Sequence, residues 1–143
     1  MIAVPQIHVF RLEDFSVVKD LQLTTENYFQ IIFKKNSDST NLFFGKSAKS
    51  IAIKVSETGC VCLFSRSFFT KIITDKLDEL FSHYEGRSVY TLDKKQELLL
   101  DSIFTKMLSE LNSHYTYKDD LLRNYISEIT HIAIKSSVAK ISV

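Results

Sequence analysis

The hydrophobic pattern of this chain changes its period near residue 65, and this change constrains the fold more than any other feature. Before residue 65, the apolar residues form short runs rich in β-branched and aromatic side chains, which is typical of strands. After it, they recur at the i, i+3, i+4 spacing of helices that bury one face. A β-rich part followed by a helical part predicts an α+β fold.

The β-rich part contains several short runs, and the strongest is the aromatic and β-branched segment Tyr28–Lys35. The segment NSDST follows it and indicates a turn, because these side chains bond locally to the backbone. The other predicted strands are Ile7–Phe10, Asn41–Phe44, Ser50–Val55 and Cys60–Phe64. Runs this short and closely spaced favour an antiparallel meander, a sandwich or a small barrel.

The helical part begins at Ser65, which can cap one or two short helices within Ser65–Tyr84. A brief extended piece at Val89-Tyr90 follows. A long helix is predicted over about Lys94–His114, because Asp93 and Gln96 have the spacing of a capping box. The last helix is predicted over about Lys118–Lys135. The short connection between these two helices predicts an antiparallel hairpin.

The size and charge of the chain exclude several classes of protein. Its 143 residues correspond to one domain, and a formal net charge of +1 provides no basic field for a phosphate backbone. No apolar run approaches the ~20 residues of a membrane-spanning helix. The N-terminus has no basic leader followed by an apolar core, and there are only two cysteines. We therefore expect a cytoplasmic protein with no membrane contact.

The residues that carry chemistry in other proteins do not form a site in this sequence. Cys60 and Cys62 point to the same face of a strand, but zinc would need two more ligands, and the usual ligand spacings are absent. We interpret them as small apolar residues on a buried face. The four histidines occur singly, and the three glycines are too far apart for a phosphate loop. We expect no catalytic residues, no metal and no cofactor, and hence no enzyme.

Two segments carry a resemblance to a known family. The first is TGCVCLFSRSFF, a strand, turn and helix start, and the second is YKDDLLRNYISEI in the last predicted helix. With the order of the elements between them, these segments resemble the N-terminal regulatory domain of AraC-type bacterial transcription regulators, over roughly residues 5–135. The matching residues are Gly59, Cys62, Leu63, Phe64, Phe68, Phe69, Lys118, Asp119, Leu121, Leu122, Arg123, Tyr125 and Ile126.

The resemblance implies one regulatory domain over 1–143, with a cupin-like β-rich part (1–64) and a helical dimerisation part (65–137). The β-rich part is short for the family, so we expect a truncated barrel or a sandwich. Such domains sense a small-molecule effector or pair two protomers. DNA is bound by a separate C-terminal domain with helix-turn-helix units, which this chain does not contain.

Two functions from different classes are left open by the sequence. A regulatory domain would use one face of Tyr28–Lys35 as a pocket wall, with Phe29, Ile31 and Phe33 as the candidate ligand-binding residues. It would form a homodimer through the last helix, with Leu122, Tyr125, Ile126 and Ile129 as the candidate interface. The same four residues could instead close the core of one protomer. The alternative function is a small structural or protein-interaction domain without a ligand.

Overall fold

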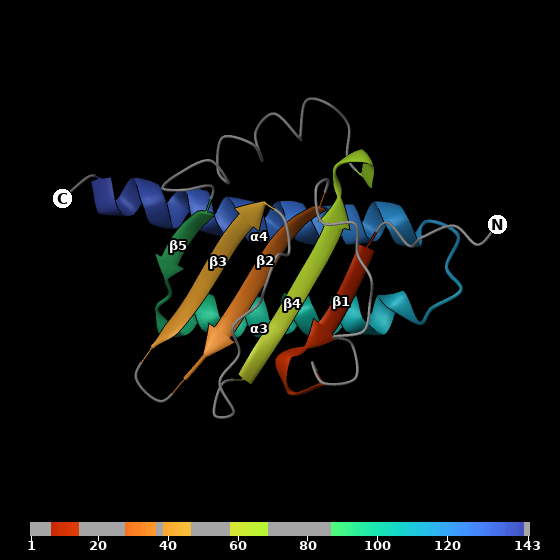
Figure 1. Cartoon of the computed structure of the whole chain (residues 1–143), viewed down its shortest axis with the longest axis horizontal. Coiled ribbons are helices and arrows are strands. Elements are labelled where there is room, and N and C mark those ends of the chain that lie inside the picture. Colours follow the sequence, from red (N-terminus) through yellow and green to blue (C-terminus); the bar gives the residue numbers. More distant parts are fainter. Residues whose placement is uncertain (1–6, 15–27, 37–38, 47–57, 69–86, 142–143) are drawn as a thin grey trace.

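The structure is a computed structural model, and it describes residues 7–14, 28–36, 39–46, 58–68 and 87–141. Within these ranges, five antiparallel strands form one sheet, and two long helices follow it in the sequence (Figure 1). The predicted α+β fold is therefore confirmed. The strands are β1 (Ile7–Arg11), β2 (Tyr28–Lys35), β3 (Thr40–Lys46), β4 (Thr58–Ser65) and β5 (Arg87–Thr91).

Each predicted strand within the described ranges is present, and β2 has the predicted bounds. The strands β1, β3, β4 and β5 each extend one or two residues beyond the predicted segment at one or both ends. The predicted strand Ser50–Val55 lies outside the described residues. So does most of the predicted helical segment Ser65–Tyr84, of which the structure describes the short 3-10 helix η3 (Arg66–Phe68).

The order of the strands in the sheet is β1-β4-β2-β3-β5, which places β2 at the centre, between β4 and β3. The register between β2 and β4 pairs Phe29 with Phe64, Ile31 with Cys62 and Phe33 with Cys60. Because side chains alternate along a strand, all of these residues lie on one face of the sheet. The described strands form an open sheet, in which β1 and β5 are the outer strands.

The two helices are α3 (Lys94–Leu111) and α4 (Lys118–Ile141), and both cross the same face of the sheet (Figure 1). The predicted capping box is present at the start of α3, where Asp93 and Gln96 exchange hydrogen bonds of 2.8 and 3.0 Å. Gln96 also donates a 2.5 Å hydrogen bond to the Ser136 hydroxyl near the end of α4. The start of α3 therefore lies beside the end of α4, which makes the pair antiparallel, as predicted.

The hydrophobic core fills the space between the sheet and the helices. At its centre, the rings of Phe33 (β2) and Phe104 (α3) stack with centroids 5.7 Å apart and planes at 4°. The side chain of Phe33 is fully buried, and that of Phe104 is 1% exposed. Side chains of both the sheet and the helices belong to this single core. Its helical members that are buried are Leu100, Ile103, Phe104, Met107, Leu122, Ile126, Ile129 and Ala133.

Gly59, at the start of β4, occupies a position that only glycine can fill. Its φ angle is +138°, and a Cβ atom there would lie 1.8 Å from the carbonyl oxygen of Phe33. Its N–H donates a 3.1 Å hydrogen bond to Oε1 of Glu13, which belongs to the 3-10 helix η1 (Leu12–Asp14). The close approach of the β4 backbone to β2 therefore depends on the missing side chain.

We expect Gly59→Ala to lower the free energy of unfolding by more than about 2 kcal/mol, because the added methyl group cannot avoid the backbone of Phe33. Gly45→Ala is the matched control. Its Cβ would meet only the end of the flexible Gln30 side chain, at 3.0 Å from Nε2, and should cost far less. Urea denaturation measures both values, and equal losses would contradict this account of Gly59.

None of the helices in the described part of the chain is both long enough and apolar enough to span a membrane.

Candidate ligand-binding face

The face of the sheet opposite α3 and α4, called the second face below, carries the other half of the strand residues. The strand register places these residues in rows that run across the sheet. Neighbours within a row have Cβ atoms about 4.5–5.5 Å apart, so adjacent side chains in a row can contact one another. Two of these rows differ sharply in polarity, and together they define the candidate site.

The polar row runs from His8 (β1) through Leu63 (β4) and Gln30 (β2) to Gly45 (β3) and Arg87 (β5). Because Gly45 has no side chain, the carboxamide of Gln30 can lie against its backbone. The Oε1 atom of Gln30 is buried and has no hydrogen-bond partner among the residues that the structure describes. A buried acceptor without a donor costs about 1–3 kcal/mol, so the unpaired Oε1 atom lowers the stability of the folded chain.

The apolar row lies next to the polar row and crosses all five strands: Phe10, Val61, Ile32, Phe43 and Val89. Exposure rises along it. The first three side chains are buried, Phe43 is half-buried, and Val89 on the outer strand β5 is 52% exposed. The second face therefore offers an apolar surface near β3 and β5, directly beside the carboxamide of Gln30.

One cation lies close to this apolar surface. The ammonium group of Lys34 (β2) is 5.4 Å from the centre of the Phe43 ring, which is within the range of a cation–π contact. The second face therefore carries a positive charge beside its apolar row.

Burial lowers the pKa of His8 from its ordinary value of 6.5, because desolvation penalises the charged imidazolium. The imidazole is therefore neutral at pH 7. The polar row therefore presents a neutral histidine and a neutral carboxamide on β1 and β2, with Arg87 at its end on β5.

The lowered pKa of His8 predicts a pH dependence of stability. Because the pKa of His8 is lower in the folded state, the folded chain binds fewer protons at this residue than the unfolded chain does. The contribution of His8 to the free energy of unfolding is therefore fully present above pH 6.5 and is lost as the pH drops below it. We expect His8→Gln to flatten the loss of unfolding free energy between pH 7 and pH 5. Urea denaturation at several pH values measures this slope. His114→Gln, which changes an exposed histidine, is the control, and an unchanged slope in His8→Gln would contradict the prediction.

The three residues predicted from the sequence to line a ligand pocket lie on the other face of β2. Phe29, Ile31 and Phe33 are 2%, 0% and 0% exposed and belong to the core between the sheet and the helices. Their packing in the core with helical side chains explains their apolar character. That they line a pocket stays a prediction, whereas the second face carries the buried carboxamide.

Of the four residues predicted at a dimer interface, three are fully buried in the core of one chain. Leu122, Ile126 and Ile129 are each 0% exposed, and Tyr125 is half-buried beside them. Their packing supports the alternative that the sequence left open, in which this stripe closes the core of one protomer. Exposed apolar side chains on the helices occur elsewhere, at Leu98 and Leu99 of α3.

Arg123 connects α4 to the 3-10 helix η3, which follows β4. Its Nε–H donates a 2.5 Å hydrogen bond to the carbonyl oxygen of Phe68, and its guanidinium lies 4.6 Å from the centre of the Phe68 ring. It also pairs with the carboxylate of Asp120 at 2.9 Å. The contact with Phe68 is specific to arginine, because a lysine has no planar fork that can stack on the ring and donate to the carbonyl together.

We expect Arg123→Lys to lower the free energy of unfolding by about 1–2 kcal/mol, since the hydrogen bond to the buried residue Phe68 and the stacking are both lost. Asp120→Asn is the control. It removes only the exposed ion pair with Arg123 and should cost at most about 0.5 kcal/mol. Chemical denaturation compares the two, and similar losses would show that the contact with Phe68 contributes little.

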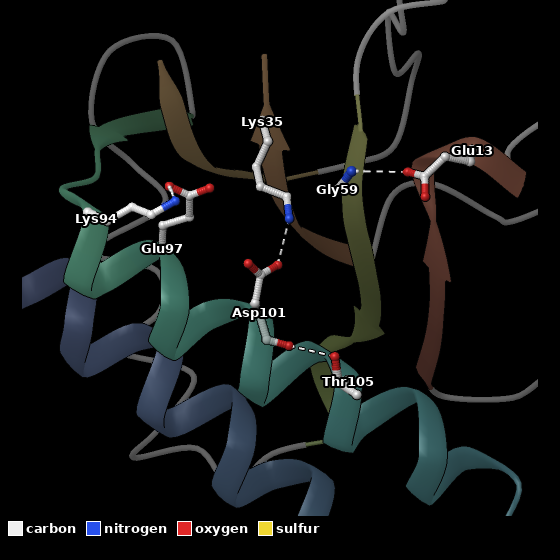
Figure 2. Close-up of polar contacts among 7 residues, drawn as sticks. All are labelled: Glu13, Lys35, Gly59, Lys94, Glu97, Asp101 and Thr105. Carbon is white, nitrogen blue, oxygen red and sulfur yellow. Dashed lines mark hydrogen bonds and ion pairs between the residues drawn. The ribbon is translucent and has the colours of Figure 1, made fainter. Parts of the chain in front are cut away.

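Polar contacts also join the sheet to α3, as Figure 2 shows. The ammonium group of Lys35, at the end of β2, lies 2.7 Å from Oδ1 of Asp101 in α3. The Thr105 hydroxyl donates to the backbone carbonyl of Asp101 at 2.7 Å. Both side chains of the ion pair are about a third exposed, so the pair orients α3 more than it stabilises the fold.

The cysteines lie where the sequence analysis placed them, on one buried face of β4. Burial raises the pKa of Cys60 to about 11, and burial also raises the pKa of Cys62, with Cys60 adding to the effect. Both thiols are therefore protonated at neutral pH and are weak nucleophiles. Within the described ranges, no three histidine, cysteine, aspartate or glutamate side chains lie close enough together to hold a metal ion.

The residues of the second face were not identified as a site from the sequence. Alternation along Tyr28–Lys35 separates Gln30 and Ile32 from the aromatic residues of the same strand, but it does not say which face the helices cover. The useful signal was a single glutamine inside the most apolar strand, because a polar residue at such a position needs a partner.

Comparisons of the chain with models of known protein families and with curated proteins give no match.

Proposed function

We propose that this chain is the regulatory domain of a cytoplasmic AraC-type transcription regulator, which senses a small molecule, forms a homodimer and does not bind DNA by itself. DNA binding would belong to a C-terminal helix-turn-helix domain. The proposal includes no catalytic activity. It is supported by the resemblance described above and by the arrangement of the segments that carry it.

One observation carries this proposal furthest. The two segments that resemble the family contact each other directly, since Arg123 of the second segment holds Phe68 of the first, 55 residues earlier in the sequence. Both segments are packing patterns, so their contact gives the resemblance a physical basis. The second face then provides the surface for an effector, and the helices provide the surface for a second protomer.

The alternative function, a protein-interaction domain without a ligand, is favoured by a different observation. Large apolar side chains are exposed on the helical part of the chain: Leu98, Leu99, Tyr115 and Tyr117. The rings of Tyr115 and Tyr117 contact each other edge to face, with centroids 5.8 Å apart, in the loop between α3 and α4. Exposed tyrosines of this kind are frequent at protein interfaces.

Sedimentation equilibrium at micromolar concentration tests the homodimer. We expect a dimer for the wild-type chain, and a monomer for the double variant Leu98→Lys and Leu99→Lys, because two charges would replace exposed apolar contacts. Ser102→Lys, at another exposed position of α3, is the matched control and should keep the dimer. A monomeric wild-type chain would contradict the proposed dimer.

Thermal-shift measurements with a broad set of small metabolites separate the two functions. A ligand that binds the folded chain raises its melting temperature by mass action. At least one stabilising metabolite is expected for a regulatory domain. A chain that no metabolite stabilises, but that still self-associates, would support the interaction domain instead.

A further inference from the structure

We propose that Gln30 is the recognition residue of the second face, and that its ligand is a flat molecule with an N–H donor beside an acceptor, such as a nucleobase or a cyclic amide. This inference rests on the proposed function, because it names the chemical class of the effector. It is argued from the hydrogen-bonding state of one side chain and from its neighbours.

Gln30 lowers the stability of the folded chain through one unpaired atom. Its Oε1 atom is buried without a donor among the described residues. The side chain nevertheless sits at a position flanked in its row by Leu63 and Gly45, and in its strand by Ile32. An apolar residue of similar size would fill this position without the penalty of an unpaired acceptor. A ligand that donates to Oε1 therefore accounts for a glutamine at this position better than a structural role does.

The second step is the chemistry of the carboxamide. It offers one acceptor and two donors side by side, whichever way the amide group is turned. Its best partner presents the complementary pair, a donor next to an acceptor, as the edge of an amide or a nucleobase does. A carboxylate presents acceptors only, so it would leave the Oε1 atom unpaired.

The third step is the surface beside the carboxamide. In the neighbouring apolar row, Ile32 is buried and Phe43 is half-buried, so a flat ring that pairs with Gln30 can lie against Phe43. On the other side of Gln30 in the polar row, beyond Leu63, stands His8, which burial keeps neutral at pH 7. The ammonium group of Lys34 lies over the ring of Phe43. The nearest neighbours of Gln30 in its row and strand, Leu63, Gly45 and Ile32, are uncharged, so the hydrogen bonds of the carboxamide dominate recognition at this point of the face.

Gln30→Met tests the first step without any ligand. This substitution keeps the length of the side chain and removes the unpaired acceptor, so the melting temperature should rise by roughly 2–5 °C. Gln96→Met is the matched control, because the carboxamide of Gln96 is paired with Ser136 and with the backbone of Asp93, and its loss should lower the melting temperature. A lower melting temperature for Gln30→Met would show that the side chain is structural and would overturn the proposal.

The ligand class is tested with uracil, adenine and nicotinamide as probes, each at millimolar concentration, in thermal-shift and amide NMR measurements. At least one probe should stabilise the wild-type chain and shift the backbone amide signals of Gly45 and Leu63. Gln30→Met should abolish the effect. The control probe 1,3-dimethyluracil has no N–H donor and should not bind.

Each remaining outcome decides against the ligand class. Failure of all three probes, equal binding to Gln30→Met, or equal binding of 1,3-dimethyluracil would overturn it. This failure can be distinguished from failure of the proposed function. If a metabolite of another chemical class stabilises the chain in the broad thermal-shift screen, the regulatory function stands and only the assignment of Gln30 falls.

Discussion

The stacking of Phe33 on Phe104 determines which face of the sheet is the inside of this protein. β2 lies at the centre of the sheet, and once Phe33 packs against α3, the alternation of the strand assigns every other residue of β2 to a face. Lys35 is then directed toward Asp101 on the same side. Gln30 and Ile32 are directed away from the helices. The candidate site exists because one face of β2 packs against the helices through residues such as Phe33, whereas Gln30 lies on the opposite face.

The local elements of the fold could largely be predicted from the sequence. β2 and the start of α3 follow from strong local signals, namely an aromatic and β-branched run and the capping pair Asp93 and Gln96. Helix ends were less accurate: α3 ends at Leu111 rather than near His114, and α4 continues to Ile141. Such ends depend on contacts with other elements, such as the hydrogen bond from Gln96 to Ser136, which no local pattern contains.

The candidate site could not be predicted in the same way, because it depends on which face the helices cover. Both faces of β2 carry apolar residues, and the face predicted as a pocket wall is the one that packs against the helices, where its role in binding a ligand stays a prediction. The same ambiguity affected α4, whose stripe around Ile126 could have served either one protomer or two. Burial within one chain is a property of the assembled fold. The hydrophobic period of a single strand (two residues) or helix (3.6 residues) does not say whether its apolar face is buried within one chain or between two.

The partners at the centre of the core are far apart in the sequence, and this has a consequence for synthesis. Phe33 emerges from the ribosome 71 residues before Phe104 (104 − 33), which corresponds to roughly 4–14 s at 5–20 residues per second. During this interval, α3 and α4 do not yet cover the apolar face of the growing sheet. A nascent chain of this kind is a natural substrate for chaperones that bind exposed apolar strands. Its abundance in the cell would then depend on how quickly α3 and α4 follow the sheet.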